Sequence, residues 1–268
     1  MTPAAATPAP TECRLGLLAF GDSITNGGGE LQWGVALQSW ALWTARGLGL
    51  PYTGYAVDAA RVTDVVERQI PAFERRSARP DARYDVGCVY IGVNDVRGLD
   101  WAAAAFAADY EHALRFLRDR CDRVVTLTAP LRLGSPPAGP KVADLNAVVR
   151  AAAADAGALV VDLSTFGARN HVMVDRVHPT AFGQIAIAER VLAVLANDGL
   201  PTAVAPSSLI DWHETRRGRL RGDLTYLYRD AKQRARAVVE RRRRARELCG
   251  GRWSGRGRTT RAHVNGRH

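Results

Sequence analysis

The sequence predicts an α/β fold in which a five-stranded parallel sheet is covered by helices on both faces. Short apolar runs alternate with amphipathic stretches five times between residues 15 and 196. This alternation is typical of parallel strands joined by right-handed helical crossovers. The run at 84–92 is almost continuously apolar, as expected for a strand that is buried on both faces of such a sheet.

The first predicted strand, residues 15–20, ends abruptly in Gly21-Asp22-Ser23, and three glycines follow at 27–29. A polar, glycine-rich turn after a buried strand lies at the carboxyl edge of the sheet, where open α/β folds bind their ligands. Ser23 is therefore expected at that edge. The later elements are predicted in this order: helix 33–48, strand 50–57, helix 61–70 ending before Pro71, strand 84–92, helix 101–118, strand 123–128, helix 142–156, strand 158–162 and helix 179–196.

Most of the net charge of +10 lies in the C-terminal quarter of the chain. Residues 1–200 contain 19 Lys and Arg against 21 Asp and Glu, whereas residues 201–268 contain 18 against 6. The composition, 47% hydrophobic and 24% charged, is that of a globular protein with one large core. The basic character belongs to an extension and says nothing about a ligand of the α/β unit.

Three parts of the chain follow from this composition: a disordered leader at 1–13, an α/β domain at 14–200 and a basic extension at 201–268. Within the extension, 201–208 is expected to be a linker, about 223–248 a helix, and 250–268 disordered. Arginine runs without an aromatic stacking pattern indicate only a positive charge and do not by themselves identify a nucleic-acid-binding module. Three interpretations stay open: a solvated helix that contacts the domain or another subunit, nucleic-acid binding, and attachment to anionic lipid.

Cysteines and termini exclude several classes of protein. Cys13, Cys88, Cys121 and Cys249 are scattered without a CxxC pair, so neither a disulfide framework nor a zinc site is expected, and Cys88 is expected in the core. The first eleven residues lack the basic and apolar regions of a secretory signal, and no apolar run reaches 18 residues. A cytoplasmic location without a transmembrane segment is the default expectation.

Three further stretches accompany Gly21-Asp22-Ser23 in a specific order. They are 56–64 (AVDAARVTD), 92–95 (GVND) and 175–179 (DRVHP). Together they resemble the GDSL, or SGNH, hydrolase family over about residues 14–197, and the combination is far more specific than an isolated GDS. The resemblance implies a three-layer α/β/α flavodoxin-like sandwich. It also implies a serine esterase or lipase that needs no metal or organic cofactor.

The chemistry of a serine nucleophile explains why these residue types occur together. A serine hydroxyl needs a base within hydrogen-bond reach, and the base needs an acceptor that orients it. Ser23, His178 and Asp175 supply the three groups, and a turn can join Asp175 to the imidazole three residues later. Alone, Ser23 would more often be a helix N-cap and His178 a partly buried loop histidine. The joint pattern favours catalysis.

An oxyanion hole is implied by the family resemblance. Its donors would be the backbone N–H groups of Ser23 and Ala59 and the side-chain amide of Asn94. Aligning the second stretch on Arg61 and Asp64 places Ala59 where the family usually has glycine. The donor survives this departure only if the φ angle at residue 59 suits an alanine.

Several other polar residues have simpler explanations. Asp22 and Asp95 are interpreted as acceptors that brace the active-site loops, and an isolated Asn-Asp pair would be a turn at a strand end. His171, Asp175 and His178 could ligate a metal, but no further ligand cluster is visible and none is expected.

Glycines and tryptophans near the nucleophile are also ambiguous. The glycines at 27–29 lack a phosphate-binding pattern and are expected to form a flexible lip. Trp33 and Trp40 could line a pocket, but their helical spacing favours the core.

The leading function is a carboxylic ester hydrolase (EC 3.1.1-like) that cleaves acyl or acetyl esters of small molecules through a Ser-His-Asp triad and an acyl-enzyme intermediate. The alternative is a nucleic-acid- or anionic-membrane-binding protein that uses the basic tail, with the α/β domain as a scaffold. Four reactive residues favour the enzyme, because a scaffold has no reason to keep them together: Ser23, Asn94, Asp175 and His178.

Overall fold

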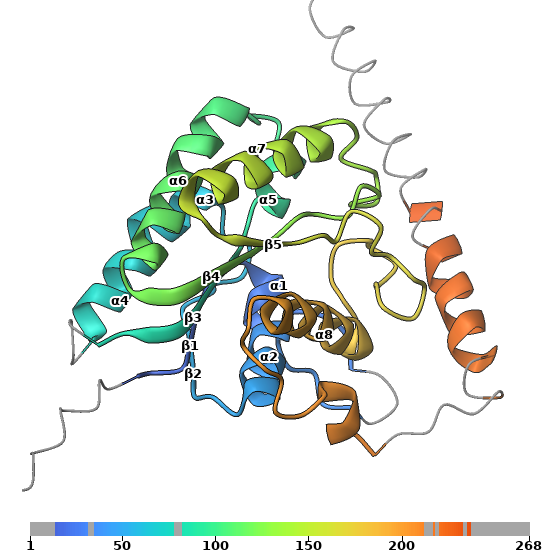
Figure 1. Cartoon of the computed structure of the whole chain (residues 1–268). Coiled ribbons are helices and arrows are strands. Elements are labelled where there is room, and N and C mark those ends of the chain that lie inside the picture. The colour runs from blue at the N-terminus through green and yellow to red at the C-terminus, as the bar shows by residue number, and fades with distance from the viewer. Residues whose placement is uncertain are drawn as a thin grey trace, which may run out of the picture.

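The structure, a computed structural model, describes residues 14–31, 35–77, 82–211, 217, 220–232 and 235–236. The expected leader at 1–13, Trp33 and the arginine run at 241–244 lie outside these ranges. Figure 1 shows a twisted central sheet with a layer of helices on each side. Among the described residues, no helix combines the length and the apolar composition needed to cross a membrane.

Five strands form the sheet, and every neighbouring pair is parallel. The strands are β1 (Leu17–Gly21), β2 (Tyr52–Gly54), β3 (Tyr84–Tyr90), β4 (Cys121–Leu127) and β5 (Leu159–Val161). Their order, β2-β1-β3-β4-β5, is the flavodoxin-like order and confirms the predicted fold class. The chain adds β2 on one side of β1 and then adds β3, β4 and β5 on the other side. In such folds the ligand-binding crevice lies where the strand order reverses, beyond the carboxyl ends of β1 and β3.

Two layers of helices cover the sheet (Figure 1). On one face α2 (Trp40–Leu48) packs against α8 (Ala181–Asn197), and on the other α6 (Ala103–Arg118) packs against α7 (Lys141–Ala156). Beside α6 lie α3 (Val62–Asp64), the π-helical segment η1 (Val65–Gln69) and α4 (Ile70–Arg76). Two very short helices, α1 (Ser23–Asn26) and α5 (Val93–Arg97), follow β1 and β3 directly.

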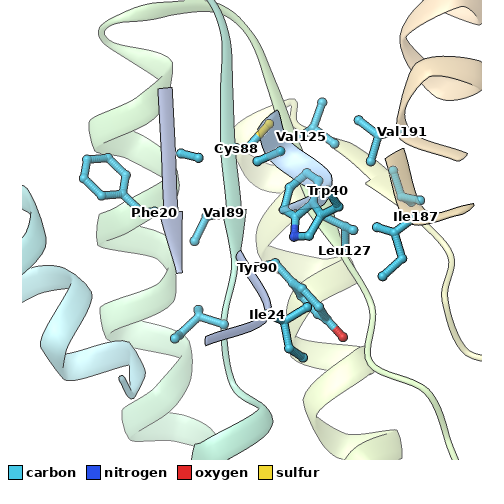
Figure 2. Packing of buried hydrophobic residues seen from close by; sticks show 14 of the residues in the cluster. Phe20, Ile24, Trp40, Cys88, Val89, Tyr90, Val125, Leu127, Ile187 and Val191 are labelled. Atoms are coloured by element: carbon cyan, nitrogen blue, oxygen red, sulfur yellow. The ribbon is translucent and has the colours of Figure 1, made fainter. Parts of the chain in front are cut away.

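The core between the sheet and the α2–α8 layer is built around Trp40 (Figure 2). Its side chain is fully buried, its ring meets Tyr90 edge to face at 6.5 Å, and its indole N–H donates to Thr25 Oγ1 at 3.3 Å. A buried tryptophan normally finds such a partner for its N–H. Trp40 is thus a core residue, as its spacing favoured, and Cys88 is fully buried as expected.

Two predicted helices have different bounds in the structure. The helix expected at 33–48 begins only at Trp40, because the Ser39 side chain caps it by accepting from the Leu42 N–H at 3.1 Å. The helix expected to stop before Pro71 continues to Arg76. The wider π-helical turn before Pro71 shifts the hydrogen-bond register, which relieves the clash of a proline ring with the preceding turn.

The segment after residue 200 packs on the domain instead of forming the expected linker. The N–H groups of Ala203 and Val204 both donate to Gly47 O, at 2.8 and 3.1 Å. A short 3-10 helix, η2 (Pro206–Leu209), then contacts α2 and α8. Residues 220–232 form a further helix, here called the C-terminal helix, and it begins earlier than the predicted 223. The rest of the predicted helix beyond 236 lies outside the described residues.

Candidate active site

Ser23 is the first residue of α1, directly after β1. The N-cap of this helix is Asp22, whose Oδ1 accepts from the Ile24 N–H at 2.9 Å. Asp22, and not Ser23, therefore caps this helix. The Ser23 hydroxyl is left to contact another loop.

A hydrogen-bonded chain joins Ser23 to His178 and Asp175. Ser23 Oγ lies 2.9 Å from His178 Nε2, and His178 Nδ1 lies 2.7 Å from Asp175 Oδ2. The other carboxylate oxygen, Asp175 Oδ1, accepts from the N–H groups of Val177 and His178 at 2.9 and 3.1 Å. A tight turn thus holds the Asp175 carboxylate against His178 Nδ1. This contact leaves His178 Nε2 facing Ser23.

The charged forms of Asp175 and His178 stabilise each other. The hydrogen bond to Asp175 raises the pKa of His178 above its ordinary value, although partial burial of the ring opposes the shift. Burial would raise the pKa of Asp175, but hydrogen bonds from the His178 side chain and from the Val177 and His178 backbone outweigh burial and lower it. An ionised carboxylate beside the imidazole favours the imidazolium that forms when the base takes a proton.

The close approach of the two loops depends on glycine. Glu30 and Thr180 form a parallel β-bridge, and the Ala181 N–H donates to Glu30 O at 2.9 Å. Gly29 has φ +154°, and a Cβ there would lie 2.2 Å from Pro179 O. The expected lip at 27–29 is therefore a packed segment. Helix α8 begins at Ala181, two residues later than predicted, because Thr180 caps it by accepting from the Gly183 N–H at 3.1 Å.

The loop that carries Ala59 is tied to the ends of β1 and β3. The Val57 N–H donates to Gly21 O at 3.1 Å, and Asn94 Nδ2 donates to Ala60 O at 3.0 Å. An amide nitrogen has two hydrogens, so this bond orients Asn94 and leaves its second N–H available. Asn94 lies in α5, the short helix that directly follows β3.

Ala59 adopts a left-handed backbone conformation, with φ 60°. An L-residue in this region carries a strain of about 1–2 kcal/mol, which glycine would avoid. The Ala59 side chain is exposed, and its N–H has no hydrogen-bond partner among the described residues. The backbone conformation usual for glycine is thus retained with alanine in place.

Asp22 and Asp95 hold the loops around Ser23. Asp95 Oδ1 accepts from the Val62 N–H at 3.2 Å, which ties α5 to the Ala59 loop. The second carboxylate oxygen of each aspartate is buried and has no hydrogen-bond partner within the described part of the chain. Burial raises the pKa of Asp22 to about 7 and that of Asp95 to about 6. Each carboxyl accepts a hydrogen bond from a backbone N–H group.

Two buried glutamines also position the turn that carries Ser23, and the sequence analysis missed them. Gln69 bonds both the N–H and the C=O of Gly21, at 3.0 and 2.8 Å. Gln184 donates to Ile24 O and Gly28 O and accepts from the Trp40 N–H. A glutamine on the apolar face of a helix was the available signal, because a buried amide must find partners.

His171 does not join the other two candidate metal ligands. Its ring stacks on Phe166 at 5.8 Å. Within the part of the chain that the structure describes, no group of three His, Cys, Asp or Glu residues is arranged to hold a metal ion.

Comparison with known proteins adds a family match and a set of structural neighbours. The model of the GDSL-like lipase/acylhydrolase family matches residues 19–185. Acetylxylan esterase Axe2 from Geobacillus stearothermophilus is 20% identical with a TM-score of 0.51, and the alignment covers 67% of this chain and 93% of Axe2. LAE5, an alpha/beta hydrolase enzyme from the metagenome of Lake Arreo, Spain, is 20% identical with a TM-score of 0.53, covering 68% and 94%. No curated protein matches the sequence.

Proposed function

The chain belongs to the GDSL-like lipase/acylhydrolase family and is a carboxylic ester hydrolase, and we propose that Ser23, His178 and Asp175 are its catalytic triad. The observation that carries the proposal is the continuous hydrogen-bonded chain from Ser23 Oγ through the imidazole to Asp175. Three groups from two distant loops meet in the order that acyl transfer requires.

In the first half of the reaction, Ser23 Oγ attacks the ester carbonyl carbon while His178 Nε2 accepts the hydroxyl proton. The C=O bond opens to an oxyanion, and the imidazolium is stabilised by Asp175. His178 then gives its proton to the leaving alcohol, and the C–O bond of the ester breaks. The product of this half is an acyl ester on Ser23.

In the second half, water replaces Ser23 as the nucleophile. His178 accepts a proton from the water, the tetrahedral intermediate collapses, and Ser23 Oγ leaves with the proton that His178 returns. The acid is released and the enzyme is regenerated.

The N–H groups of Ser23 and Ala59 and the Asn94 amide are proposed to bind the oxyanion. Ser23 is the first residue of α1, so its N–H has no partner within the helix. The Ala59 N–H also has no hydrogen-bond partner among the described residues, and Asn94 keeps one amide hydrogen available. Each such donor contributes about 10²–10³-fold to kcat in hydrolases of this type.

Residues 14–200 are proposed as the catalytic domain, with the segment from 201 onward as an extension. The family match at 19–185 lies inside the proposed domain. The extension is proposed to act through the domain, since its described residues pack against α2, α8 and the loop before α8.

Hydrolysis of p-nitrophenyl esters from acetate to palmitate tests the triad. Ser23→Ala is expected to lose at least about 10³-fold in kcat, while the thermal midpoint stays close to the wild type. The matched control is Ser207→Ala, because Ser207 is exposed on η2, far along the chain from the triad. Full activity of Ser23→Ala would refute the proposed nucleophile.

A further inference from the structure

A cavity of about 720 Å³ lies beside the proposed triad. Its walls include Ile24, which follows Ser23, and Val177 and Pro179, which lie on either side of His178. Ser23 and His178 are not themselves among the lining residues, so the cavity lies next to the two loops that carry them. Its volume is within the range of about 300–1,000 Å³ that small-molecule sites occupy.

The cavity is at the carboxyl edge of the sheet. Tyr90 is the last residue of β3, Leu131 follows β4, and Leu163 follows β5, and all three line it. Ligands of open α/β sheets bind outside this edge. Half of the sixteen other lining residues are apolar as well, including Phe166 and Ile187. Such a wall suits a hydrocarbon chain.

One wall of the cavity comes from the C-terminal helix, which lies outside the family match. Tyr226, Leu227 and Asp230 line the cavity from this helix. Figure 1 shows the helix beside the loop that precedes α8. The residues matched by the family model do not supply this wall.

Specific contacts hold the helix in place. Arg169, on the loop before α8, lies 3.7 Å from the Asp223 carboxylate and stacks on the Tyr226 ring at 5.6 Å. Arg229 forms an ion pair with Glu30, the residue that bridges to Thr180. The helix is thus bound to both loops that carry the proposed triad.

We propose that this cavity binds the acyl chain of the ester and that the C-terminal helix forms part of the acyl-binding site. The inference rests on the proposed function, since it assigns the chain to the ester that Ser23 attacks.

An acyl site of this kind produces a preference for longer chains. Each methylene that leaves water for an apolar wall gains about fourfold in binding. We therefore expect kcat/KM for p-nitrophenyl esters to rise from acetate toward laurate. The laurate-to-acetate ratio of kcat/KM is the useful readout, because the fraction of active enzyme cancels.

Tyr226→Ala removes one wall of the cavity, and Tyr228→Ala is its matched control. Tyr228 lies on the same helix but is 67% exposed and lines no part of this cavity. Tyr226→Ala is expected to lower the laurate-to-acetate ratio by about fivefold or more, whereas Tyr228→Ala leaves it within twofold. Leu131→Trp, at a half-exposed position of the wall, fills the cavity and is expected to lower the ratio too.

Calorimetric titration of laurate into Ser23→Ala separates this inference from the proposed function. Laurate is expected to bind, and the additional change Tyr226→Ala is expected to weaken binding by a similar factor. A ratio unchanged by Tyr226→Ala, an equal fall in Tyr228→Ala, or no laurate binding would overturn the acyl site. Absence of Ser23-dependent hydrolysis would refute the triad, and the titration alone would then decide the cavity's ligand.

Discussion

Replacing Ala59 by glycine should stabilise the protein. At φ 60°, alanine carries about 1–2 kcal/mol of backbone strain that glycine does not. Glycine raises the conformational entropy of the unfolded chain, which offsets about 0.4–1 kcal/mol of this gain. The free energy of unfolding is therefore expected to rise by about 1 kcal/mol in Ala59→Gly. Urea unfolding at fixed pH measures the change.

Ala205→Gly is the matched control for this prediction. Ala205 is also exposed, but its φ of −72° is an ordinary one for alanine. Only the entropy of the unfolded chain changes there, so stability should fall by about 0.4–1 kcal/mol. Esterase activity of Ala59→Gly should stay within about twofold, because the N–H donor is retained. Destabilisation of both variants by the same amount would refute the strain at residue 59.

Three further predictions concern the residues around the triad. Asp175→Asn removes the hydrogen bond that raises the pKa of His178, so kcat should fall about 10³–10⁴-fold and the acidic limb of the kcat/KM profile should move to lower pH; an unmoved limb would contradict the assignment. Asp22 has its pKa raised by burial from 3.8 to about 7, so its contribution to stability is present below pH 3.8 and is lost as pH rises to about 7. Urea unfolding between pH 4 and 7 should show this loss, up to about 4 kcal/mol, in the wild type and not in Asp22→Asn. Gly29→Ala places a Cβ against Pro179 O and should lower the thermal midpoint far more than Gly139→Ala, where φ is +75° and no atom lies within 4 Å; equal shifts would show that the close approach is unimportant.

The sequence sufficed for the order of strands and helices and for the loops that carry Ser23, Asn94 and His178. Buried parallel strands have continuous apolar runs, and each candidate residue directly follows such a run or precedes a helix. These are local patterns, so they survive without knowledge of the tertiary structure.

Other features depend on contacts between distant segments. Helix α2 begins at Trp40 because Ser39 caps it, although the apolar periodicity extends further toward the N-terminus. The π-helical turn before Pro71 and the bonds of Gln69 to β1 depend on how that helix meets the sheet. Periodicity does not encode such contacts.

The sign of φ at Ala59 was the question that the sequence left open. The φ angle depends on how the loop around Ala59 closes. The Val57 N–H on one side of Ala59 donates to Gly21 O, and Ala60 O on the other side accepts from Asn94. Alanine is compatible with either sign at different energies, so residue type alone does not determine the donor's direction. The placement of the C-terminal helix against Arg169 and Glu30 likewise depends on tertiary contacts.

Covalent labelling with an ethyl p-nitrophenyl alkylphosphonate tests the central claim most directly. Ser23 Oγ should displace p-nitrophenolate from phosphorus, and His178 should accept the hydroxyl proton. Mass spectrometry of the digested protein should find one phosphonyl group per chain, on the peptide that contains Ser23. The label should be absent from Ser23→Ala. Stoichiometric labelling of another residue, or an active enzyme that takes up no label, would contradict the account.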